Sequence, residues 1–124
     1  MDYLSILPSW REALAEAGLD QLDALLSFAG GDCLSRHLRG KTSRVQLPSG
    51  AVVFIKQDHH TKWKTIGRYV LRLQKPQPNT EKERVRLLMA SELGIVVPEI
   101  VAWGQRRRLG LPYQGVLVML PIKG

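Results

Sequence analysis

A lysine and a glutamate are the residues of this sequence whose positions most favour a functional ion pair. Lys56 ends the apolar run VFIK at 53–56, whose β-branched content is typical of a strand. Glu83 lies near the start of a segment with helical periodicity that ends before Gly94. An ammonium group on a buried strand is costly without a counter-charge, and a carboxylate on a neighbouring helix supplies one. We therefore expect Lys56 and Glu83 to form an ion pair.

Both residues also have ordinary structural explanations. Lys56 ends its strand, so its ammonium group could simply reach water while its methylene groups stay on the apolar face. Glu83 stands three residues after Thr80, in the T-x-x-E pattern of a helix capping box. The cap and the lysine compete for one carboxylate, so the sequence leaves both roles of Glu83 open.

A short basic segment, RGKT at 39–42, is predicted to turn between two strands. Gly40 is its one glycine, and Lys41 and Thr42 could donate hydrogen bonds to phosphate oxygens. A single glycine falls short of the glycine-rich motifs that bind phosphates. An ordinary hairpin turn is therefore the alternative interpretation of this segment.

The elements around these residues alternate in a way that is typical of an α+β domain. Short helices are expected at 8–18 and 20–26, and a longer helix begins at Asn79 or Thr80 and ends at Leu93. Residues 57–79 are hard to assign, although 63–73 has some helical character. Strands are predicted at 33–39, 43–47, 51–56, 99–106 and 114–119. The prediction is one domain, 1–124, with a five-stranded antiparallel sheet, one main packed helix and short N-terminal helices.

Composition limits the classes of partner. The net charge of +7 and the pI near 10 favour acidic partners such as nucleotide phosphates, anionic lipid headgroups or nucleic acid. The single cysteine rules out an internal disulfide and suits a reducing compartment. No metal site is expected, because the adjacent His59 and His60 would point in opposite directions in an extended chain. We expect a cytoplasmic protein, with peripheral contact with the inner membrane as one option, since no apolar run approaches the roughly 20 residues of a membrane span.

Several motifs of this chain resemble the lipopolysaccharide core kinase family, which phosphorylates Kdo or heptose sugars of the inner core. The family belongs to the protein-kinase-like superfamily. The resemblance runs through most of the chain, and its most specific part is the pair of motifs LGIVVPE and VAWG. The matching segments are LPSWRE at 7–12, VFIK at 53–56, Glu83, LGIVVPE at 93–99, VAWG at 101–104 and GVLVM at 115–119.

The resemblance implies the N-terminal, nucleotide-binding lobe of a kinase that uses ATP and Mg²⁺. Lys56 would hold the α- and β-phosphates, Glu83 would orient Lys56, and the turn with Gly40 and Lys41 would fold over the phosphates. Three residues would contact the adenine: the Met119 side chain, the Leu120 carbonyl and the Ile122 amide. The full-length protein would transfer the γ-phosphate of ATP to an inner-core sugar hydroxyl.

The chain departs from the family at its end. The family's catalytic and metal-binding aspartates belong to the larger lobe, and the sequence stops at Gly124, before either. We therefore expect no catalytic or metal-binding residue within 1–124, no phosphotransferase activity from this chain alone, and self-association through the apolar surface that the missing lobe would cover. The residues expected to face water there are Met119, Leu120, Ile122 and apolar residues of the helix that carries Glu83, and the alternative is that residues 114–124 fold back and cover this surface. The alternative function is a non-catalytic basic module that binds nucleic acid or an anionic membrane, and the lack of interleaved aromatic residues weakens nucleic acid as the partner.

Overall fold

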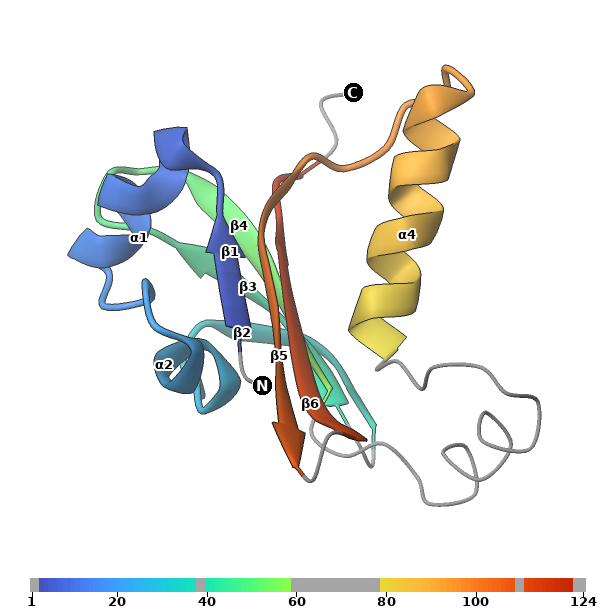
Figure 1. Ribbon diagram of the computed structural model, residues 1–124. Coiled ribbons are helices and arrows are strands. Elements are labelled where there is room, and N and C mark those ends of the chain that lie inside the picture. Colours follow the sequence, from blue (N-terminus) through green and yellow to red (C-terminus); the bar gives the residue numbers. More distant parts are fainter. Residues whose placement is uncertain (1–2, 38–39, 59–78, 109–110, 122–124) are drawn as a thin grey trace.

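The protein is one twisted sheet with helices on both of its faces (Figure 1). The computed structural model describes residues 3–37, 40–58, 79–108 and 111–121. In this part of the chain six strands form a single antiparallel sheet in the order β1-β5-β6-β4-β3-β2. Their bounds are β1 Tyr3–Ile6, β2 Asp32–His37, β3 Gly40–Gln46, β4 Val52–Asp58, β5 Ile100–Arg108 and β6 Leu111–Met119.

The sixth strand corrects the predicted count of five. β1 pairs with β5, with Tyr3 opposite Gln105 and Ile6 opposite Ala102. Gly104 permits this pairing, because a Cβ atom there would lie 2.6 Å from the Tyr3 carbonyl oxygen. Five strands lie where the sequence predicted them, with β3 longer than predicted by two residues, β4 and β5 by one residue each and β6 by three residues.

The helices also agree with the prediction. The short ones are the 3-10 helix η1 (Pro8–Trp10), α1 (Arg11–Glu16) and α2 (Leu22–Leu26), and the main helix is α4 (Asn79–Glu92). Figure 1 shows α1 and α2 on one side of the sheet and α4 on the other. The helical character expected at 63–73 lies outside the described residues.

The apolar core lies between the sheet and the two short helices. Leu14 of α1 and Leu25 of α2 are fully buried against Val53 and Ile55 of β4. Gln57 continues this side of β4, and its side-chain amide donates hydrogen bonds to the carbonyl oxygens of Leu25, Leu26 and Phe28, at 2.7, 3.2 and 3.0 Å. The carbonyl end of α2, which a helix leaves without partners, is thus fixed to β4.

The opposite face of the sheet carries the functional candidates. Since side chains alternate along a strand, Phe54 and Lys56 point away from the core of Val53 and Ile55. This second face packs against α4, which contacts β4, β5 and β6. Leu117 of β6 lies directly opposite Lys56 and is 0% exposed.

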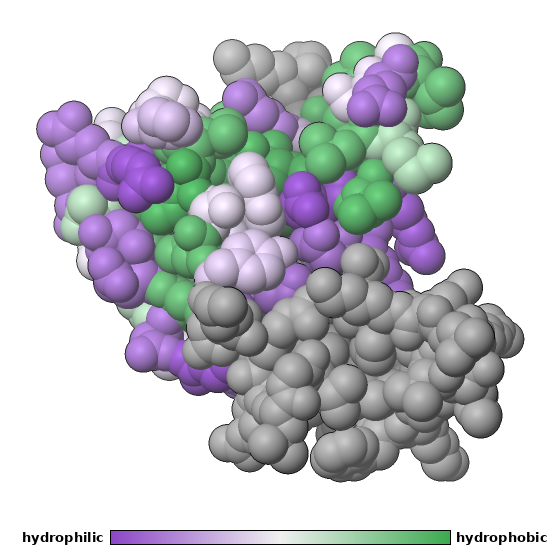
Figure 2. Space-filling view, viewed as in Figure 1, coloured by the Kyte–Doolittle hydropathy of each residue, from purple (hydrophilic) through white to green (hydrophobic). Residues whose placement is uncertain are grey.

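Several apolar side chains of α4 are exposed, although the helix packs on the sheet. They share its exposed side with Arg86 and Glu92, and Leu93, just past the end of the helix, is 79% exposed. Figure 2 shows apolar surface, coloured green, at the end of α4 that is farther from Asn79. The prediction that apolar residues of this helix face water is therefore confirmed for Val85, Leu88, Met89 and Leu93. The same prediction was wrong for Met119, which is 6% exposed because it lies inside the sheet between Phe54 and Ile100.

Candidate functional site

Lys56 and Glu83 form a two-point ion pair between β4 and α4. The Lys56 Nζ atom donates to both carboxylate oxygens of Glu83, at 2.6 Å and 2.8 Å. The two side chains are 32% and 34% exposed, so the pair lies at the edge of the packed region rather than inside it. The predicted ion pair is confirmed, and the alternative of a lysine that simply reaches water is wrong.

The sheet register explains why Lys56 is on this face. One row of cross-strand neighbours crosses the sheet from β1 to β3, and such neighbours point to the same face. The row consists of Ser5, Trp103, Leu117, Lys56 and Thr42. Lys56 therefore stands between an apolar residue, Leu117, and a hydroxyl, Thr42, with α4 above the row.

The capping role of Glu83 is not realised. α4 already includes Asn79, so Thr80 lies inside the helix rather than at its cap. The Thr80 Oγ1 atom is buried and has no hydrogen-bond partner among the described residues. The carboxylate of Glu83 is bound to Lys56 instead, which decides between the two roles that the sequence left open.

The segment expected as a phosphate-binding turn is largely strand. Gly40, Lys41 and Thr42 begin β3 and pair with Asp58, Gln57 and Lys56. The prediction of a turn was thus wrong for Gly40, Lys41 and Thr42, which belong to β3, and Arg39 lies outside the described residues. A Cβ atom on Gly40 would lie 2.2 Å from the Gln57 carbonyl oxygen, so the glycine allows close strand pairing.

The pairing of Lys41 also separates it from the ion pair. Lys41 stands opposite Gln57, which points toward α2, so its side chain starts from the face opposite to Lys56. Thr42, directly opposite Lys56, is the residue of this segment that shares the face of the ion pair.

The residues expected around an adenine lie at the end of β6. Met119 is buried and lies opposite Phe54 of β4. Phe54 is two residues before Lys56 and points to the same face of the sheet. The backbone N–H of Leu120 donates to the Glu99 carbonyl oxygen at 2.8 Å, which leaves the Leu120 carbonyl as the group for a ligand. Ile122 lies outside the described residues. Phe54 was not singled out from the sequence, although its place two residues before Lys56 was the available signal.

Arg84 is a second charged contact of α4 that sequence reasoning did not identify. Its Nε and second terminal nitrogen donate to the two oxygens of Glu81 at 2.9 Å and 2.5 Å. Its guanidinium carbon lies 5.1 Å from the centre of the Trp103 ring, in cation–π range. The hydrogen bonds that Arg84 donates to the Glu81 carboxylate raise the pKa of its guanidinium, which therefore stays charged.

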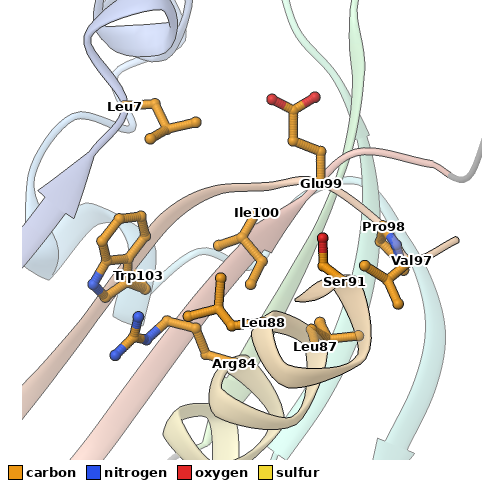
Figure 3. Close-up of a pocket in the computed structure, with 10 residues that line it drawn as sticks. All are labelled: Leu7, Arg84, Leu87, Leu88, Ser91, Val97, Pro98, Glu99, Ile100 and Trp103. Atoms are coloured by element: carbon orange, nitrogen blue, oxygen red, sulfur yellow. The ribbon is translucent and has the colours of Figure 1, made fainter. Parts of the chain in front are cut away.

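Two hollows flank α4. One, of about 380 Å³, lies between the second half of α4 and β5, and Figure 3 shows Arg84 and Trp103 side by side in its wall. Most of its lining is apolar, with side chains from Leu7, Leu87, Leu88, Val97, Pro98, Ile100 and Trp103. The other, of about 580 Å³, borders Glu83 and includes Lys82, Arg86 and Leu87 in its lining. Two cationic side chains therefore lie beside the ion pair.

Neither metal ligands nor a membrane-spanning helix were found where the structure can be described. Within 3–37, 40–58, 79–108 and 111–121, no three His, Cys, Asp or Glu side chains come together as metal ligands. No helix in these ranges has the length and apolar character needed to cross a bilayer.

Comparison with known proteins gives a fold but no family. No protein-family model matches the chain, and a search of curated proteins finds no match. One solved structure that it resembles is that of WaaP in complex with acyl carrier protein, with 17% sequence identity and a TM-score of 0.60. The likeness covers 98% of this chain and 42% of the WaaP chain, so the sequence spans less than half the length of that relative. The chain thus has an α+β fold consistent with a protein-kinase-like small lobe, with six strands rather than five.

Proposed function

We propose that this chain is the ATP-binding lobe of a lipopolysaccharide-kinase-like protein. The observation that carries the proposal is the ion pair in which Lys56 donates to both oxygens of Glu83. In kinase-type active sites a strand lysine held by a helix glutamate binds the nucleotide phosphates. The pair of Lys56 on β4 and Glu83 on α4 is an arrangement of this kind.

The geometry of the ion pair suits a phosphate ligand. A lysine ammonium has three N–H donors, and Glu83 accepts two contacts from it. The third donor can therefore bind a phosphate oxygen without breaking the pair. Thr42 is opposite Lys56 in the sheet and can add a hydroxyl donor, and Lys82 and Arg86 add positive charge beside Glu83.

The base would lie toward the end of β6. Phe54 offers an aromatic face on the same side of the sheet as Lys56, with Met119 beside it. The Leu120 carbonyl and the Ile122 amide are proposed for the edge of the adenine. In this arrangement Gly40 supports the strand pairing, and Lys41 contributes at most long-range positive charge, because its side chain starts from the other face.

The activity of the whole protein is a proposal of its own. Its motifs resemble the lipopolysaccharide core kinases, and its fold resembles WaaP over nearly the whole chain. We propose that the full-length protein transfers the γ-phosphate of ATP to an inner-core sugar hydroxyl, with Mg²⁺ ligands and the catalytic base outside residues 1–124. The charge of +7 would favour peripheral contact with the anionic surface of the inner membrane.

Nucleotide binding is the direct test. Titration of the 124-residue chain with a fluorescent ATP analogue should give saturable binding that unlabelled ATP displaces. The Lys56→Met variant should bind at least tenfold more weakly, because hydrogen bonds to charged groups contribute about 1.5–3 kcal/mol. Arg11→Met is the matched control, since it removes a cation from α1 on the other side of the sheet.

Two outcomes would contradict the proposal. Equal loss of binding in both variants would show that nucleotide is attracted by net charge alone. Absence of nucleotide binding, combined with salt-dependent binding to anionic vesicles that Lys56→Met leaves unchanged, would favour the non-catalytic basic module instead.

A further inference from the structure

Arg84, which contacts the Trp103 ring, follows Glu83 in α4, and its contact has no part in the proposed binding of phosphate. We propose that Trp103 is a positioning residue: by holding Arg84, it sets the rotation of α4 that lets Glu83 reach Lys56. The inference rests on the proposed function for its importance to nucleotide binding. Its structural part, the effect on the ion pair, stands independently.

The two contacts lie on the same face of the sheet, on either side of Leu117 beneath the helix. Glu83 and Arg84 are consecutive, so they leave α4 about 100° apart. Their partners, Lys56 and Trp103, lie in one cross-strand row on either side of Leu117, about 10 Å apart at the usual strand spacing. That separation matches the width of a helix with its side chains. A rotation of α4 that shortened one contact would stretch the other.

Apolar packing alone would fix this rotation poorly. The side of α4 that faces the sheet includes Thr80, Glu83 and Arg84, with Leu87 as its larger apolar member. The apolar residues Val85 and Met89 face water instead, and Leu88, which is 47% exposed, lines the open hollow between α4 and β5. Since a helix is normally oriented by its apolar stripe, the two charged contacts must supply much of the orientation here.

Arg84 is held in a fixed position, as one of two contacts that orient α4 must be. Glu81, one turn earlier, binds the guanidinium at two points, and the side chains of Arg84 and Glu81 are only 21% and 12% exposed. A two-point carboxylate contact fixes the plane of the guanidinium as well as its position. Trp103 therefore contacts α4 through the fixed plane of the Arg84 guanidinium.

Two substitutions separate the electrostatic contact from simple bulk. Trp103→Phe keeps an aromatic face for Arg84, whereas Trp103→Leu keeps apolar volume without one. We expect Trp103→Leu to weaken binding of the fluorescent ATP analogue about three- to tenfold, the range of a cation–π contact, and Trp103→Phe to stay within about twofold. Trp10→Leu is the matched control, since Trp10 packs against the core on the other face of the sheet.

The ion pair itself gives a readout that does not depend on nucleotide. Folding constants of the wild type, Lys56→Met, Glu83→Gln and the double variant form a cycle that measures the coupling of the two residues. The cycle is then repeated in the Trp103→Leu and Trp10→Leu proteins. We expect Trp103→Leu to reduce the logarithm of the Lys56–Glu83 coupling factor by at least half. We expect Trp10→Leu to leave this coupling unchanged.

The outcomes distinguish this proposal from the proposed function. Unchanged coupling in the Trp103→Leu protein would overturn the positioning role, whether or not ATP binds. Equal effects of Trp103→Phe and Trp103→Leu would overturn it as well, because they would reduce Trp103 to a packing residue. Reduced coupling in a chain that binds no nucleotide would keep the positioning role and reject the ATP site.

Discussion

Removal of the charge on Glu83 is the sharpest single test of the ion pair. Glu83→Gln keeps the size of the side chain and an oxygen that can accept one hydrogen bond from Lys56, but it removes the second oxygen contact and the charge. Both contacts, at 2.6 Å and 2.8 Å, are short enough for the loss to be measurable. The substitution therefore isolates the electrostatic part of the pair.

The expected size of the effect follows from the exposure of the pair. At a separation of about 3 Å the Coulomb attraction is about 1.4 kcal/mol in a water-like medium and about 5.5 kcal/mol at a protein-like dielectric of 20. Both side chains remain about one-third exposed, so solvent screening holds the attraction near the lower value. Ordering two long side chains offsets part of it. We expect Glu83→Gln to lower the free energy of unfolding by about 1 kcal/mol.

The effect on nucleotide binding should be smaller than that of losing Lys56. In Glu83→Gln the ammonium group remains and can still meet a phosphate, but it is less well held. We expect about a three- to fivefold loss of affinity, against at least tenfold for Lys56→Met. The ranking of the variants, rather than one value, is the prediction.

Urea denaturation and titration with the fluorescent ATP analogue measure the two quantities. Glu92→Gln, which removes an exposed carboxylate from the last turn of the same helix, is the matched control and should change unfolding by less than about 0.5 kcal/mol. If Glu83→Gln proves as neutral as Glu92→Gln in both assays, the pair contributes neither to the placement of α4 nor to the site, and the reasoning above fails.

Three further predictions follow from other parts of the structure. Gly40→Ala should destabilise the protein by about 1–3 kcal/mol in urea denaturation, because its Cβ would meet the Gln57 carbonyl oxygen at 2.2 Å; a neutral result would mean that β3 and β4 do not pair closely there. Lys41→Met should weaken binding of the ATP analogue less than Lys56→Met, since the two lysines start from opposite faces, and equal losses would contradict the register. The chain should self-associate in sedimentation experiments across a concentration series, and Leu93→Glu should shift it toward monomer; a wild type that stays monomeric at high concentration would reject the exposed side of α4 as an interface.

Local sequence patterns were sufficient to predict most elements and the central ion pair. Alternation at 52–56 predicted both faces of β4, so the direction of Lys56 could be inferred without tertiary information. The apolar residues and Gly94 placed α4 within one or two residues. With both elements placed, Glu83 was the carboxylate of the helix best placed to reach Lys56. The free-energy cost of a buried lysine without a counter-charge then predicted the pair.

What the sequence could not give depends on distant pairing and on register. β1 has only four residues, and it joins the sheet opposite β5, about a hundred positions later in the chain, with Tyr3 opposite Gln105. The placement of Lys41 failed because β3 already begins at Gly40, which pairs with Asp58, so that Lys41 is a strand residue. A shift of one residue moves every side chain of a strand to the other face, and a local pattern with a single glycine does not determine it.

The distribution of polarity on α4 connects the ion pair with the exposed apolar residues of the same helix. The helix meets the sheet through the Glu83 and Arg84 contacts and leaves several apolar side chains exposed. A partner that covered these residues would bury their apolar side chains, which favours binding. It would also contact the helix that carries Glu83. Since the contacts beneath α4 are directional and few, a small rotation of the helix would separate Glu83 from Lys56 before it disturbed the core on the other face. A partner bound to the exposed apolar residues of α4 would therefore change the Lys56–Glu83 contact before it changed the core.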